Sequence, residues 1–123
     1  MAEVVVYHNP NCSSSRSALE VAEATGAEVE VVRYLTRPPD AATLRSLLAI
    51  LEDPATDLVR RDQTFAGLGL SDEDVATEDQ VVAVLVEHPK LFQRPVVVAG
   101  GRAVIGRPKD RVAPFLAEAL GTA

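Results

Sequence analysis

The chain has 123 residues, of which 47% are hydrophobic, and its formal net charge is -6. This length is enough for one folded unit with its own core, so we expect a single domain over residues 1–123. The acidic balance argues against nonspecific binding to nucleic acid or to anionic membranes, because both depend on basic surface.

The first part of the chain has the pattern of a strand, a helix and a second strand. Residues 4–7 form an apolar run that predicts a short buried strand, and residues 28–34 alternate charged and apolar side chains, as a second strand does. Between them, the serine hydroxyls of residues 13–15 are candidate caps for a helix, and Gly26 ends it.

The middle of the chain predicts a helical insertion over roughly residues 38–90. Asp40 is placed to cap a helix whose leucines recur at the spacing of one helical face. Thr77 and Gln80 have the spacing of a capping box, so another helix begins there and runs to the next proline. Residues 65–70 contain two glycines and predict a turn between the two helices.

The end of the chain predicts a hairpin and a last helix. Two apolar runs flank Gly100 and Gly101, which is typical of a tight hairpin, and Asp110 is placed to cap a helix with an apolar stripe. This order of elements indicates an α/β fold in which one sheet mixes parallel and antiparallel pairs. It matches the thioredoxin-like layout, a mixed sheet flanked by helices, with the helical insertion between the second strand and the hairpin.

Cys12 is the only cysteine, and it lies where the first strand gives way to the first helix. Unpaired amide hydrogens and the positive end of the helix dipole favour a thiolate there, so we expect a thiol pKa below about 8.5. A free cysteine can instead be an inert core residue. The neighbouring asparagine, proline and serine residues favour the first interpretation, with a reactive sulfur presented to solvent.

A lone thiol also limits the chemistry and the compartment. It cannot form an internal disulfide and suits a reducing environment, so we expect a cytoplasmic protein. Ser15 stands where a C-x-x-C centre carries its second thiol, so an adduct on Cys12 needs an external thiol such as glutathione or a small redoxin. The chain has no recognised metal-ligand spacing, export signal or apolar run of about 20 residues, so we expect no metal, bound cofactor or membrane anchor.

Two arginines stand out as candidate ligands for an oxyanion, because a planar guanidinium donates paired hydrogen bonds. Arg94 precedes a proline at the start of a predicted strand, and Arg107 precedes another proline as the hairpin ends. The prolines restrict the backbone at both sites, so a functional role and a surface ion pair both stay open for these two arginines. Arg16 adds positive charge near Cys12, and His8 either tunes the thiol or is a structural polar group.

Residues 8–16, which read His-Asn-Pro-Asn-Cys-Ser-Ser-Ser-Arg, resemble the active-site motif of glutaredoxin-coupled arsenate reductases. Residues 91–98 and 105–108 resemble the two later arginine-proline signatures of that family. The resemblance covers essentially the whole chain. It implies a thioredoxin-like fold in which Pro95 is a cis proline.

The same resemblance implies roles for individual residues. Cys12 would attack arsenate, glutathione would attack the cysteine-bound arsenic, and glutaredoxin would complete the reduction to arsenite. The residues that would hold the oxyanion are Arg60, Arg94 and Arg107, and those that would support the thiolate are His8, Ser15 and Arg16. The segment after Arg61 is one residue shorter than the family pattern, so Arg61 is an alternative to Arg60.

Two other functions stay open. Spx-like regulators, which bind RNA polymerase, resemble the same fold, although their usual pair of cysteines is missing from this sequence. A thiol oxidoreductase of the same family with a different substrate is the second alternative. For the leading hypothesis we expect a monomer with arsenate as substrate, glutathione or another low-molecular-weight thiol as co-substrate, and a glutaredoxin-type protein as reductant.

Overall fold

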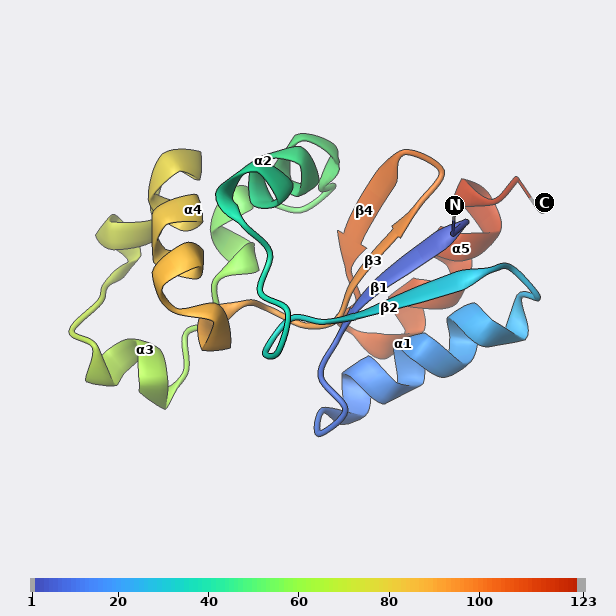
Figure 1. Cartoon of the computed structure of the whole chain (residues 1–123), viewed down its shortest axis with the longest axis horizontal. Helices are drawn as coiled ribbons and strands as arrows, with labels where there is room; N and C mark the ends of the chain where they lie inside the picture. The colour runs from blue at the N-terminus through green and yellow to red at the C-terminus, as the bar shows by residue number, and fades with distance from the viewer. Residues whose placement is uncertain (1, 122–123) are drawn as a thin grey trace. The chain divides into compact units, whose positions relative to one another are not determined.

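A four-stranded mixed sheet organises the two ends of the chain (Figure 1). The computed structural model describes residues 2–121. The strands are β1 (Val4–His8), β2 (Val29–Arg33), β3 (Val96–Ala99) and β4 (Arg102–Ile105), in the spatial order β2-β1-β3-β4. β1 pairs in parallel with β2 and antiparallel with β3, and β3 pairs antiparallel with β4. The predicted mixed α/β sheet is therefore confirmed.

Helices α1 (Ser13–Ala24) and α5 (Val112–Ala119) cover one face of this sheet. Alternate strand residues point to that face, and the register pairs Val6 with Val97 and Val4 with Ala99. The buried side chains of the shared core are Val4, Val6, Val97, Ala99 and Val104 from the strands and Ala18, Ala22, Val112, Phe115 and Leu116 from the helices. This packing fixes the start of α1 beside the end of β1.

The predicted hairpin between β3 and β4 is confirmed. Gly100 and Gly101 join the strands with φ angles of 58° and 73°, a backbone region that side chains disfavour and that suits a two-residue hairpin turn. A Cβ atom on Gly100 would also clash with the backbone oxygen of Ala119 in α5. Glycine at the first turn position therefore serves both the turn and the helix packed against it.

Residues 34–93 form a second compact unit, while the first unit takes in the chain up to Arg33 and from Arg94 onward. The predicted helical insertion falls within this second unit. Its elements are α2 (Ala41–Ile50), α3 (Gln63–Gly67), α4 (Glu78–Glu87) and short 3-10 turns at Ala55–Leu58, Asp72–Val75 and Pro89–Leu91. Within residues 2–121, no helix is both long enough and apolar enough to cross a membrane.

Two helix starts predicted in the second unit are confirmed. The Asp40 carboxylate accepts from the Thr43 N–H at 2.8 Å at the start of α2. Thr77 and Gln80 form a reciprocal capping box at the start of α4, with hydrogen bonds of 3.2 and 3.1 Å. In each case a side chain satisfies an amide that the helix itself leaves unpaired.

Two local predictions are wrong, and a third, the turn over residues 65–70, holds only at residues 68–69. The turn predicted over residues 65–70 includes the second half of α3, which Asp62 caps and which buries the ring of Phe65. The N-cap of α5 is Arg111 rather than Asp110, because Asp110 lies in a 3-10 turn (Lys109–Arg111) that precedes the helix. The N-cap of α1 is Cys12 rather than a serine.

Candidate active site

Hydrogen bonds around Asn9 fix the turn between β1 and α1. The Asn9 side chain is buried and its Oδ1 accepts from the Asn11 N–H at 2.9 Å, while its carbonyl oxygen accepts from the Cys12 N–H at 3.0 Å. Arg16 Nη1 donates to the Pro10 carbonyl oxygen at 2.9 Å. Cys12 then begins α1 as its N-cap. The sulfur therefore lies beside the first amides of the helix, which have no partner within the helix.

Ser15 is fully buried in the first turn of α1, and its hydroxyl supports the turn instead of capping the helix. It accepts from the Asn9 N–H at 2.9 Å and forms a 2.7 Å hydrogen bond with His8 Nδ1. Burial lowers the pKa of His8, and the charges of Arg33 and Arg16 lower it too, against the hydrogen bond with Ser15. His8 is therefore neutral at about pH 7 and orients Ser15; it adds no positive charge beside the thiol.

Cys12 is only 9% exposed, so the expectation of a sulfur presented to solvent is wrong. Its surroundings are nevertheless polar, because Arg107 Nη2 donates to Sγ at 3.3 Å. Burial alone would raise the thiol pKa, but groups that favour the thiolate outweigh it, and the pKa falls below its ordinary value. In order of effect these groups are the Ser15 N–H, a hydrogen bond from the Arg94 side chain, the charge of Arg107 and the Ser14 N–H.

The loops that carry Arg94 and Arg107 are joined by a direct contact. Arg107 Nε donates to the Arg94 carbonyl oxygen at 2.7 Å, while the other edge of the same guanidinium reaches Cys12. The peptide bonds before Pro95 and Pro108 are both cis, and the first is the geometry that the family resemblance implies. One planar cation thus links the thiol to the loop before β3.

Gly106 allows the two loops to approach each other closely. Its N–H donates to the Pro95 carbonyl oxygen at 2.8 Å. A Cβ atom at this position would lie 2.8 Å from Pro95 Cγ and 3.0 Å from Val112 Cγ2, so a side chain would have to displace one of them. Glycine therefore holds the end of β4, and with it Arg107, against the cis proline.

Arg61 lies in the second unit, where its guanidinium is held by several groups of that unit. It donates to the backbone carbonyl oxygens of Thr56 and Val59 at 2.5 and 2.6 Å and pairs with Asp72 at 3.2 Å. Its cationic carbon also lies 5.4 Å from the centre of the Phe65 ring. These contacts fasten the segment before α3 and engage both edges of the guanidinium.

Arg60, also in the second unit, is held mainly through its backbone. Its N–H donates to the Leu91 carbonyl oxygen at 2.8 Å, beside the isolated bridge that pairs Val59 with Phe92. Its side chain is 22% exposed, and Nε lies 3.7 Å from Asp62 Oδ2, a looser ion pair than the one formed by its neighbour. The guanidinium of Arg60 is therefore held by fewer groups of its unit than that of Arg61.

Within the first unit, the structure gathers several predicted site residues around one sulfur: Cys12, Ser15, Arg94 and Arg107. His8 lies behind Ser15, and the Arg16 guanidinium holds the turn through Pro10. We did not predict a role for Asn9, although an asparagine before proline in a turn is a known signal for a side chain that bonds its own backbone.

A model described as the ArsC family matches residues 7–115 of the chain. The uncharacterized protein YfgD of Escherichia coli K12 is 46% identical over 112 residues, which are 89% of this chain and 93% of YfgD. The arsenate reductase of Neisseria meningitidis serogroup A is 36% identical over 118 residues, which are 94% of this chain and 100% of that protein.

Among solved structures, the arsenate reductase from Vibrio cholerae superposes with a TM-score of 0.82 at 36% identity, covering 94% of this chain and 98% of that one. The predicted thioredoxin-like class is confirmed by this match together with the mixed sheet. The same family is indicated by three features: the turn that carries Cys12, the two arginine-proline loops, and the similarity along nearly the whole sequence. The chain belongs to the ArsC family.

Proposed function

We propose that this protein reduces arsenate to arsenite through the Cys12 thiolate. The observation that carries the proposal is the 3.3 Å contact of Arg107 Nη2 with Cys12 Sγ, at a thiol whose pKa lies below its ordinary value. Relatives that are 36% identical over almost the full chain are named arsenate reductases, which supports the same activity here.

The first step is attack of the Cys12 sulfur on the arsenic of arsenate. A sulfur–arsenic bond forms, and one arsenate oxygen leaves as water after taking up protons from solvent. Arg94 and Arg107 donate hydrogen bonds to the remaining oxygens and stabilise the negative charge that builds up on them. The amides of Ser14 and Ser15, which favour the thiolate at the helix N-terminus, stay beside the sulfur during this step.

The second step needs a thiol from outside the chain, because Cys12 is the only cysteine. The thiolate of glutathione or of another low-molecular-weight thiol attacks the cysteine-bound arsenic. Arsenic takes two electrons from the two sulfur atoms and leaves as arsenite, and the two sulfurs remain as a disulfide. A glutaredoxin-type protein then restores the Cys12 thiol by exchange. The need for reduced thiols supports a reducing compartment, the cytoplasm.

Arg60 is our choice for the third oxyanion ligand. Arg61 is engaged by the carbonyl oxygens of Thr56 and Val59 and by Asp72, whereas the Arg60 side chain has the looser ion pair with Asp62. A guanidinium that already donates along both edges has fewer donors left for arsenate. This difference supports Arg60 over Arg61.

The direct test is a coupled assay that follows NADPH oxidation with arsenate, glutathione, glutaredoxin and glutathione reductase. We expect arsenate-dependent turnover that phosphate inhibits competitively, and loss of that turnover in Cys12→Ser. Ser13→Ala, a change at an exposed neighbour in the same turn, is the matched control and should retain turnover. Equal turnover in Cys12→Ser and wild type would refute the proposal.

A second candidate keeps the thiolate and changes the substrate. It is the alternative that the sequence left open, and the 46% identity to YfgD is compatible with either substrate. Turnover of oxidised or glutathionylated small molecules in the same coupled assay, with no turnover of arsenate, would select this alternative. Association with RNA polymerase in the absence of any turnover would instead select an Spx-like role.

A further inference from the structure

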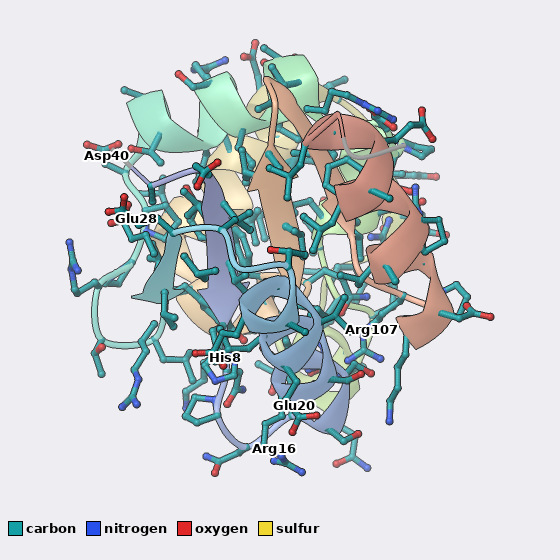
Figure 2. The ribbon with its side chains drawn as sticks, turned by 90° about the vertical axis from the view of Figure 1, so that its right-hand side faces the viewer. His8, Arg16, Glu20, Glu28, Asp40 and Arg107 are labelled. Atoms are coloured by element: carbon teal, nitrogen blue, oxygen red, sulfur yellow. The ribbon has the colours of Figure 1, made fainter. Side chains whose placement is uncertain are left out.

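The charges of the first unit are separated along its strands. The unit has seven acidic and seven basic side chains, so it carries no net charge, and the net charge of -6 resides in residues 34–93. Six of the seven cations belong to the edge of the sheet at which Cys12 lies: Arg16, Arg33, Arg94, Arg107, Lys109 and Arg111. Two acidic residues accompany them: Asp110, and Glu20, which follows Arg16 by one turn of α1 and lies near it in Figure 2.

Strand register fixes this placement. β1 and β2 are parallel, and their last residues, His8 and Arg33, pair with each other. β3 begins two residues after Arg94, β4 ends two residues before Arg107, and Lys109 starts the 3-10 turn that follows. Chain ends that meet in this way lie at one edge of a sheet.

The opposite edge carries acidic residues. Glu3 and Glu28 precede the paired starts of β1 and β2, and the Glu28 N–H donates to a Glu3 carboxylate oxygen at 3.2 Å. At the far end of β4, Arg102 pairs with Glu118 of α5 at 3.2 Å. Figure 2 shows Glu28 above, and His8, Arg16 and Arg107 below, along the same unit.

Three of the cations at the Cys12 edge are exposed and have no place in the oxyanion cluster, and one of them, Arg16, already holds the turn through the Pro10 carbonyl oxygen. Arg33 is exposed at the end of β2, and its charge acts on His8, the residue behind Ser15. Lys109 is exposed two residues after Arg107. Arg94 and Arg107 face the sulfur, so they cannot also serve a second anion at a distance from it.

We propose that Arg33 and Lys109 form a docking surface for the carboxylates of an anionic low-molecular-weight thiol and direct its sulfur to Cys12. The inference deepens the proposed function and rests on its external thiol. A small, extended thiol fits better than a folded protein, because Cys12 is only 9% exposed and a cysteine on a protein surface would have to reach a recessed sulfur. The net charge of the chain does not attract an anion, so the effect comes from direct contact of the carboxylates with these two cations, which holds such a thiol near the sulfur.

The test uses exchange at Cys12 without arsenate, so its result does not depend on the proposed reaction. The protein is first converted to its mixed disulfide with thionitrobenzoate at Cys12, the only cysteine. An added thiolate attacks the Cys12 sulfur, a new disulfide forms, and coloured thionitrobenzoate leaves with the electron pair of the broken bond. Mass spectrometry confirms the thiol bound to Cys12.

Glutathione and its diethyl ester are compared, because they share one thiol and differ in two carboxylates. Rates are corrected for the fraction of each thiol that is present as thiolate. The quantity compared is the rate with glutathione divided by the rate with the diethyl ester, and any effect of the leaving group cancels in this ratio. We expect this ratio in the wild-type protein to fall at least about threefold when the salt concentration rises from about 0.02 to about 0.5 M. At low salt, the ratio in the double variant Arg33→Gln, Lys109→Gln should lie below the wild-type ratio by about the same factor.

The matched control is Arg102→Gln, which removes one positive charge at the opposite edge of the same sheet and should leave the ratio unchanged. Circular dichroism and thermal unfolding confirm that all variants are folded. A ratio that is insensitive to both salt and the double variant overturns the inference. So does a ratio that falls equally in the Arg102 variant, since net charge alone would then explain it.

Discussion

Arg107 Nη2 lies 3.3 Å from Cys12 Sγ, although 95 positions separate the two residues in sequence. The same guanidinium donates from Nε to the Arg94 carbonyl oxygen at 2.7 Å. One side chain therefore stabilises the thiolate and ties together the two loops that supply guanidinium groups. An ammonium can supply the charge, but it lacks the planar fork that allows both contacts at once.

Arg107→Lys should raise the pKa of the Cys12 thiol and lower turnover of arsenate by about tenfold or more, because a point charge replaces an aligned donor at the reacting sulfur. The rate of alkylation by iodoacetamide as a function of pH reports the thiol pKa. Lys109→Gln, a change of charge in the same region, should leave that pKa profile close to wild type. An unchanged profile in Arg107→Lys would show that Arg107 does not act on the thiolate.

Ser15→Ala should lower the free energy of unfolding by about 1 to 3 kcal/mol, because it leaves the buried Asn9 N–H and His8 Nδ1 without the Ser15 hydroxyl. The thiol pKa should stay below its ordinary value, since the Ser15 group that acts on Cys12 is the backbone N–H. Ser13→Ala, at an exposed position, should change the free energy by less than about 0.5 kcal/mol. Urea denaturation measures the free energy of unfolding of both variants. Equal losses in Ser15→Ala and Ser13→Ala would show that the Ser15 hydroxyl does not support the turn.

His8→Asn should reduce the loss of stability that the wild-type protein shows on acidification. The pKa of His8 is below its ordinary value of 6.5 in the folded protein, so the unfolded chain binds the proton more readily. His8 therefore stabilises the folded protein fully at a pH above 6.5, and this stabilisation is lost as the pH falls toward the pKa of His8 in the folded protein. Urea denaturation at about pH 7.5 and about pH 5 should show the wild-type advantage over His8→Asn shrinking at the lower pH. A constant advantage would argue against a neutral, buried histidine.

Arg60→Gln and Arg61→Gln should have opposite signatures. The first should raise the KM for arsenate by about tenfold or more and change the free energy of unfolding by less than about 0.5 kcal/mol. The second should lower that free energy by about 1 to 2 kcal/mol, because Arg61 is bonded to the Thr56 and Val59 carbonyl oxygens. Steady-state kinetics and urea denaturation separate the two. The reverse assignment would make Arg61 the ligand.

Thr77→Ala should lower the free energy of unfolding by about 1 kcal/mol, since the Thr77 hydroxyl caps α4. Asp110→Ala should change it by less than about 0.5 kcal/mol, because Arg111 is the N-cap of α5. Chemical denaturation of the two variants measures the contrast. A larger loss of stability in Asp110→Ala than in Thr77→Ala would show that Asp110 caps α5, as the sequence predicts.

Helices and turns with a local cause could be predicted from the sequence. The capping box of Thr77 and Gln80, the Asp40 cap and the glycine pair of the hairpin each act within a few residues of chain. The start of α1 was harder, because any of three consecutive serines could cap it. Only the fold shows that Ser15 turns toward His8 and β1 and leaves Cys12 as the N-cap.

The site itself was partly predictable. Position beside proline singled out Arg94 and Arg107, and both act on the sulfur. The exposure of Cys12 could not be predicted, because its burial comes from groups brought in from distant parts of the chain. Local polarity correctly indicated polar surroundings and wrongly indicated access to solvent. The different partners of Arg60 and Arg61 also depend on tertiary contacts.

Titration of the Cys12 thiol shows whether the fold stabilises its thiolate. The ultraviolet absorbance of the thiolate is recorded against pH for the wild-type protein, with Cys12→Ser as the blank, so a single cysteine gives a single transition. A peptide of residues 9–16 provides the reference for the same sequence without the fold. We predict that the protein's thiol ionises at lower pH than the thiol of the peptide. Ionisation at the same or a higher pH would contradict the account.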